Sequence, residues 1–129
     1  MANGLKIGDA FLLPTPPNDL HLFVAVALAP NGKYLCVNVT SYRPTSDTSC
    51  VLEPNCPDMH SFIKHKSVIN YKRAREIEAA TLETLISSGY CIPKGPFSTS
   101  VLQQIQQGGL NSTRLKNKYK EYIKLFIAV

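Results

Sequence analysis

The sequence lacks any apolar run approaching the roughly 20 residues that a membrane-spanning helix needs. Its opening stretch, Met1–Lys6, is polar and lacks the long apolar block of a secretory signal peptide. Both absences argue against a membrane partner and against export. We therefore expect a cytoplasmic protein.

Charged residues are also scarce, at 18% of the chain, whereas apolar residues make up 44%. This balance is typical of a folded globular protein and not of a disordered one. The sequence has no internal repeat, no low-complexity segment and no long linker. Because 129 residues are enough for one hydrophobic core, we expect a single domain over residues 1–129.

Acidic residues are outnumbered by basic ones, 9 against 14, which gives a net charge of +5. Such an excess indicates a polyanionic partner. The basic residues form two clusters, which are Lys64, Lys66, Lys72, Arg73 and Arg75, and then Arg114, Lys116, Lys118, Lys120 and Lys124. The second cluster is typical of a solvated helix face, so the first is the better candidate for binding an anion.

The four cysteines, Cys36, Cys50, Cys56 and Cys91, are not needed as disulfides in a chain of this length, and we expect them to be reduced. Two thiols followed by two imidazoles are ligand types that zinc selects, and here they are Cys50, Cys56, His60 and His65. The spacing of the two thiols differs from that of common zinc fingers. We therefore expect no metal and no cofactor, and zinc at these four residues stays an alternative.

Residues 60–71 form the most unusual segment of the chain. Two histidines, two lysines, two serines and a tyrosine surround only a few apolar residues. Groups that transfer protons, placed beside cations, are suited to a site for an anionic substrate. A solvated loop that happens to carry two histidines is the alternative.

The first part of the chain predicts strands. Short apolar or alternating runs cover residues 10–13, 20–28, 33–41, 48–52, 67–71 and 74–77. Pro30-Asn31-Gly32 predicts a tight turn between the second and third runs, because Asn-Gly accepts positive backbone angles. Five or six short strands with hairpin links favour a small β-barrel over about residues 5–80.

The second part of the chain predicts helices. Apolar residues recur at helical spacing over residues 81–89, from Ser98 or Thr99 up to Gly108-Gly109, and over 111–126. A Pro/Gly loop, 92–96, separates the first helix from the second. The expected fold class is thus mainly β with appended α, a small barrel followed by C-terminal helices over about residues 81–127.

The order of these segments resembles a known family. The segments are Gly8–Leu13, an apolar strand opened by His21, then Leu35–Ser41, Ser67–Tyr71 and Arg75–Ile77. Together they look like the strand order of the PemK/MazF group of toxins over about residues 5–85. The resemblance implies an SH3-like barrel that cuts single-stranded messenger RNA without a metal. It suggests an antitoxin protein as a partner. A homodimer is a further expected assembly.

The resemblance also implies site residues. The family typically opens its second strand with an arginine and a proline, and this chain has His21 in place of that arginine. At the end of the third strand the family has a threonine or serine facing the site, which Thr40 and Ser41 match. Arg43 follows closely and can supply the missing cation. The loss of the arginine–proline pair leaves the family's activity in this chain open.

The chemistry of RNA cleavage selects candidates independently of the family. Proton transfer at neutral pH points to His21, His60 and His65. The remaining candidates are cations for the phosphate, Arg43, Lys64, Lys66 and Arg73, and rings for stacking a base, Tyr71 or Phe62. His21 lies in an apolar run, so an ordinary histidine of the core or rim is its alternative reading. Tyr71 follows a β-rich triplet, so a half-buried ring whose hydroxyl reaches a partner is its alternative reading.

Two functions from different classes fit these residues. The first is a toxin-like, metal-independent endoribonuclease acting on single-stranded RNA, with His21 or His60 as the base and His65 as the acid. The second is a non-catalytic SH3-like module that binds a protein partner, such as an antitoxin, or nucleic acid. The two differ in whether RNA is cut.

Overall fold

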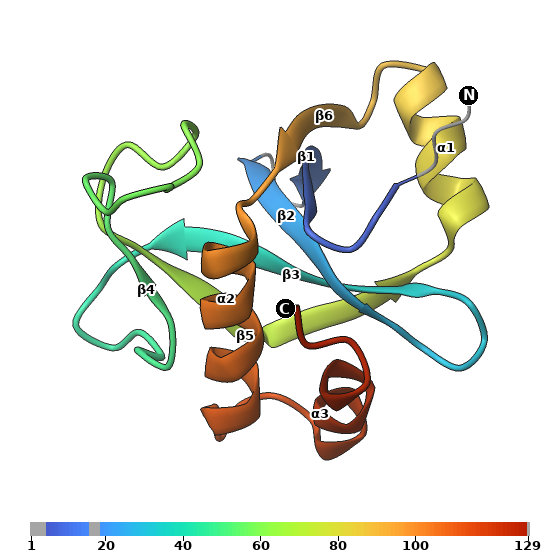
Figure 1. Cartoon of the computed structure of the whole chain (residues 1–129). Coiled ribbons are helices and arrows are strands. Elements are labelled where there is room, and N and C mark those ends of the chain that lie inside the picture. The colour runs from blue at the N-terminus through green and yellow to red at the C-terminus, as the bar shows by residue number, and fades with distance from the viewer. Residues whose placement is uncertain (1–4, 16–18, 129) are drawn as a thin grey trace.

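The computed structural model describes residues 5–15 and 19–128. Six strands and three helices are found in these residues (Figure 1). In chain order they are β1 (Asp9–Thr15), β2 (Asp19–Leu28), β3 (Tyr34–Ser41), β4 (Val51–Leu52), β5 (Ser67–Ile77), α1 (Ala79–Ser87), β6 (Ile92–Pro96), α2 (Thr99–Asn111) and α3 (Asn117–Lys124).

The strands form one antiparallel sheet with the order β4-β5-β3-β2-β1-β6. The sheet curls as a half-barrel, and α2 and α3 follow it in the chain (Figure 1). The predicted fold class, mainly β with appended α, is confirmed. Among the described helices none is long and apolar enough to cross a membrane.

The central strand β2 is buried on both faces because its side chains alternate between two apolar clusters. Leu22 and Val24 point to the face that α2 and α3 cover, where they join apolar residues of those helices. Phe23 and Ala25 point to the opposite face and join Leu82 of α1. The sheet therefore carries a core on each side.

The larger core is closed by α2 and by the chain that follows it. Of the two predicted caps of α2, Ser98 and Thr99, the cap is Ser98, since its Oγ accepts a hydrogen bond from the Val101 N–H at 3.2 Å. Gln106 is fully buried, and its amide nitrogen donates to Val26 O at 3.0 Å and to Phe126 O at 2.7 Å. These bonds tie β2, α2 and the C-terminal segment together.

The smaller core covers only one end of the other face of the sheet. Leu82 packs there with Phe11, Phe23 and Cys36. Further along the same face, β3 places Asn38 opposite Asn70 of β5. This end of the face is therefore polar.

Several predicted boundaries are corrected. Residues 92–96, expected as a Pro/Gly loop, form β6, which pairs with β1 although all five residues are exposed. The two runs at 67–71 and 74–77 form one strand, β5, with a register shift opposite Cys36/Asn38. The strand expected at 48–52 is reduced to β4, and the helix expected at 111–126 begins only at Asn117.

The turn between β2 and β3 lies where it was predicted, but of the Asn-Gly pair only Gly32 takes a positive φ. Gly32 has a φ of 83°, in the left-handed region that favours glycine. Its N–H donates to Ala29 O at 2.9 Å, and the Ala29 N–H donates to Lys33 O at 2.8 Å. The hairpin sets the register of β2 and β3 and thereby aligns the two strand ends that form the candidate site.

All four cysteines are free thiols, as predicted. Cys36, Cys50 and Cys91 are buried and Cys56 is exposed. Burial raises the pKa of Cys36 to about 12 and that of Cys50 to about 11, and it also raises the pKa of Cys91. We expect one thiol, Cys56, to react rapidly with a disulfide reagent, because it is the exposed one of the four.

This expectation is checked by counting the thiols that react in the native protein and again in denaturant. Cys56→Ser should abolish the fast native reaction, and all remaining thiols should react once the chain is unfolded. Rapid native reaction in Cys56→Ser would contradict the burial of the other three.

Candidate functional site

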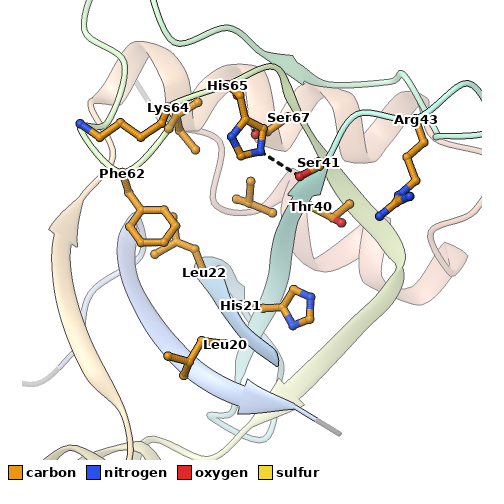
Figure 2. Close-up of a pocket in the computed structure, with 12 residues that line it drawn as sticks. Leu20, His21, Leu22, Thr40, Ser41, Arg43, Phe62, Lys64, His65 and Ser67 are labelled. Carbon is orange, nitrogen blue, oxygen red and sulfur yellow. Dashed lines mark hydrogen bonds between the residues drawn. The ribbon is translucent and has the colours of Figure 1, made fainter. Parts of the chain in front are cut away.

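A pocket of about 350 Å³ lies where β2 begins and β3 ends, beside the loop that precedes β5 (Figure 2). It is lined by Leu20, His21, Leu22, Val39, Thr40, Ser41, Arg43, Phe62, Ile63, Lys64, His65 and Ser67. Seven of the predicted site residues therefore meet here, and they are His21, Thr40, Ser41, Arg43, Phe62, Lys64 and His65. We call this the strand-end pocket.

His21 occupies the start of β2, opposite Leu13 of β1. It is half-buried, and its Nδ1 lies 2.6 Å from Oγ1 of Thr15, at hydrogen-bond distance. The alternation of β2 that turns Phe23 and Ala25 to the smaller core places His21 on the same face, beyond the apolar cluster. Thr15 thus orients the imidazole and engages one ring nitrogen.

His65 contributes a second imidazole from the loop. Its Nε2 lies 2.8 Å from Oγ of Ser41, and this bond crosses from the loop to the end of β3 (Figure 2). Ser41 pairs with Ser67 in the sheet, and Oγ of Ser67 donates to His65 O at 2.9 Å. The position of His65 is therefore set by the last pair of the β3–β5 ladder.

The charge of the strand-end pocket is positive. Arg43 and Lys64 extend from different sides of it (Figure 2), and none of its described lining residues is acidic. Among the described residues neither cation forms an ion pair. Both remain available to an anion, which agrees with the net charge of +5.

The remaining lining of the pocket is apolar. Phe62 is 40% exposed and Leu20 is 56% exposed, although both are large hydrophobic side chains. Ile63, between Phe62 and Lys64, is buried and fixes the loop to the larger core. An exposed ring beside cations is a feature of proteins that stack single-stranded bases.

His60 lies outside the strand-end pocket. Its Nε2 lies 3.0 Å from Lys94 O and 3.2 Å from Gly95 O, and its Nδ1 accepts from the Phe62 N–H at 3.0 Å. Its ring also packs on Phe97, with centroids 4.9 Å apart. His60 thus joins the loop to β6 and orients Phe62.

Tyr71 points away from the site. Its side chain is 1% exposed, and its hydroxyl donates to Ile105 O of α2 at 2.5 Å. Burial raises the pKa of Tyr71 above its ordinary value. A ring enclosed in the core cannot stack on a base, so of the two predicted rings only Phe62 is placed for that role.

Lys66 and Arg73, the two other predicted phosphate ligands, lie near the strand-end pocket without lining it. The Lys66 ammonium sits 4.2 Å from the centroid of the exposed Tyr42 ring. Arg73 lines an adjoining pocket of about 220 Å³ together with His21 and Thr40. The two pockets share these last two residues.

The predicted alternative of a zinc site finds no support in the geometry. Cys50 is buried, whereas His65 bonds to Ser41 and His60 bonds to carbonyl groups near β6. Within the described part of the chain, no group of three or more His, Cys, Asp or Glu side chains is placed to hold a metal ion.

Sequence reasoning missed several residues around the site. Phe23, Asn38 and Asn70 line the adjoining pocket. The signal for Asn38 was present, since Cys36, Asn38 and Thr40 alternate with the apolar residues of β3. The alternation indicated the face but not the pocket on it.

No protein-family model, no curated protein and no solved structure matches this chain.

Proposed function

We propose that this protein is a metal-independent endoribonuclease that cuts single-stranded RNA in the strand-end pocket. The observation that supports the proposal most is the meeting of two histidines and two cations, His21, His65, Arg43 and Lys64, in one pocket without a described acidic side chain. RNA cleavage needs a base for the 2′-hydroxyl, an acid for the leaving oxygen and donors for the phosphate.

In this proposal His21 is the general base. A His21 tautomer that donates its Nδ1–H to Thr15 leaves the Nε2 lone pair free. Nε2 then takes the proton of the 2′-hydroxyl, and that oxygen attacks the adjacent phosphorus. The bond from phosphorus to the 5′-oxygen breaks, which gives a 2′,3′-cyclic phosphate.

His65 is the general acid. In the protonated form its Nε2–H donates to Ser41 Oγ, and the hydroxyl of Ser41 can pass its own proton to the leaving 5′-oxygen. Thr40 adds a hydroxyl donor on the same strand end. Arg43 and Lys64 stabilise the extra negative charge that develops on the phosphate oxygens.

Phe62 supplies a stacking surface, which favours a single strand because paired bases do not offer their faces. The resemblance to PemK/MazF toxins agrees with this activity. On that basis we propose a toxin role in the cytoplasm, with an antitoxin protein that would cover the strand-end pocket and with a homodimer as the assembly.

The second candidate is a binding module that holds RNA or a protein without cutting it. The exposed Phe62 and Leu20 beside Arg43 and Lys64 favour it, since they form a partly apolar, cationic surface. The two functions share the surface and differ in whether a covalent bond is broken.

Incubating the purified protein with single-stranded RNA in EDTA tests the proposal. We expect fragments that end in a 2′,3′-cyclic phosphate, as the attack by the 2′-hydroxyl requires. RNA with a 2′-deoxy substitution at the cleaved position should stay intact. Uncut RNA at high protein concentration, together with salt-sensitive binding, would reject the enzyme in favour of the binding module.

A further inference from the structure

The adjoining pocket, which we call the sheet-face pocket, lies on the polar end of the sheet. It is lined by Thr15, His21, Phe23, Asn38, Thr40, Asn70, Arg73 and Arg75. Strand pairing places Phe23, Asn38 and Asn70 in one row across β2, β3 and β5. The helix α1 packs on the apolar end of this face, so the pocket begins where that core stops.

Asn38 is the unusual member of this row. It is 5% exposed, and its Oδ1 is buried without a hydrogen-bond partner among the described residues. A buried acceptor without a donor costs stability. Valine would fill the same strand position at no such cost, so an asparagine here is better explained by a ligand that brings the missing donor.

Two arginines complement this acceptor. Arg75 holds its guanidinium 5.2 Å from the centroid of Phe23, and Arg73 lines the same pocket. Guanidinium groups donate in a plane and pair well with base acceptors, above all with guanine O6 and N7. The pocket thus combines one free acceptor with two sets of donors.

We propose that the sheet-face pocket binds a guanine base of the RNA, next to the phosphate that is cut. Guanine offers N–H donors at N1 and N2 for Asn38 Oδ1, and acceptors at O6 and N7 for an arginine. His21 and Thr40 line both pockets, so a base in one belongs to a nucleotide adjacent to the phosphate in the other. This inference rests on the proposed action on RNA and adds its base preference.

The test uses binding and not cleavage, so that it can fail independently of the enzyme proposal. The probes are 2′-O-methyl oligouridines, which lack the attacking hydroxyl, with a single central guanine, adenine, cytosine or uracil. Fluorescence anisotropy gives the affinity for each. We expect the guanine probe to bind about tenfold more tightly than the uracil probe, as one well-made pair to a base provides.

Three variants test whether the guanine preference arises in the sheet-face pocket. Asn38→Val should bring the ratio of guanine to uracil affinity close to one while the melting temperature stays the same or rises, because the unpaired acceptor is gone. Arg73→Gln should also reduce the ratio. Lys72→Gln makes the same change of charge one residue away and should leave the ratio unchanged, since Lys72 does not line the pocket.

The inference is overturned if the four probes bind equally, if another base is preferred, or if Asn38→Val keeps the guanine preference. None of these results depends on whether the protein cuts RNA. Conversely, a guanine preference that Asn38→Val removes would stand even if RNA proved to be bound and left intact.

Discussion

Replacing His65 by alanine is expected to slow RNA cleavage by about 100-fold or more, the loss typical of a missing acid or base. His65 is the imidazole bonded to Ser41, so its removal takes away the group that replaces the proton Ser41 passes to the leaving oxygen. His21→Ala should cause a loss of similar size by removing the base. The measurement is the single-turnover rate on a defined single-stranded RNA in EDTA.

The control is Lys66→Ala, which changes the residue next to His65. Lys66 packs on Tyr42 and does not line the strand-end pocket, so its loss should affect RNA binding more than the single-turnover rate. Combining His65→Ala with His21→Ala should cost less than the product of the single losses, because the two groups act in one step. Undiminished cleavage in both folded single variants would reject the assigned roles.

Much of the sheet could be predicted from the sequence because the patterns that specify β2 and β3 are local. A long apolar run, an Asn-Gly turn and an alternating strand specify a hairpin with little outside information. Strand β6 could not be found this way. Its residues Pro93 and Pro96 indicate a loop. Its strand conformation comes from pairing with β1, whose paired residues lie 80 to 87 positions earlier in the sequence.

The part of the site that could be predicted is the part formed by strand ends. His21, Thr40 and Ser41 come together because the β2–β3 hairpin aligns the start of one strand with the end of the other. Of the two loop histidines, His65 lines the strand-end pocket and His60 does not. This difference depends on the conformation of the loop, in which Asp58 adopts a φ of 63°. The sequence does not predict that conformation.

The burial of Tyr71 could have been predicted from the alternation of side chains along β5. In β5, Ile69 and Tyr71 are two residues apart and point to the same side, which is the larger core. Reading the strand with period two would have placed the ring inside. Of the two readings of Tyr71, the buried ring with a bonded hydroxyl is the one found, and the role in stacking a base is not.

The sequence predicts that a helix ends at Gly108 and Gly109. They lie inside α2, which continues to Asn111. A Cβ on Gly108 would lie 2.5 Å from the Tyr71 hydroxyl, 2.7 Å from Cys50 Cβ and 2.8 Å from Ser49 O. The glycine allows α2 to approach β5 and the chain before β4, and this close approach buries Tyr71.

Gly108→Ala is therefore expected to destabilise the fold by about 2 kcal/mol. Alanine gains about 1 kcal/mol in helix propensity, while overpacking against three atoms, one of them a backbone oxygen, costs about 3 kcal/mol. Overpacking wins because a backbone oxygen cannot move aside as a flexible side chain can. Urea unfolding measures the effect, and the melting temperature should fall by roughly 5–10 °C.

Two variants separate this clash from a general effect of changing α2. Gln107→Ala alters the exposed neighbour and should change stability by less than about 0.5 kcal/mol. Tyr71→Phe removes one of the three clashing atoms, so Gly108→Ala should cost less in the Tyr71→Phe background than in the parent. Equal costs in both backgrounds would show that the clash lies with Cys50 and Ser49 alone, and a neutral Gly108→Ala would contradict the close approach itself.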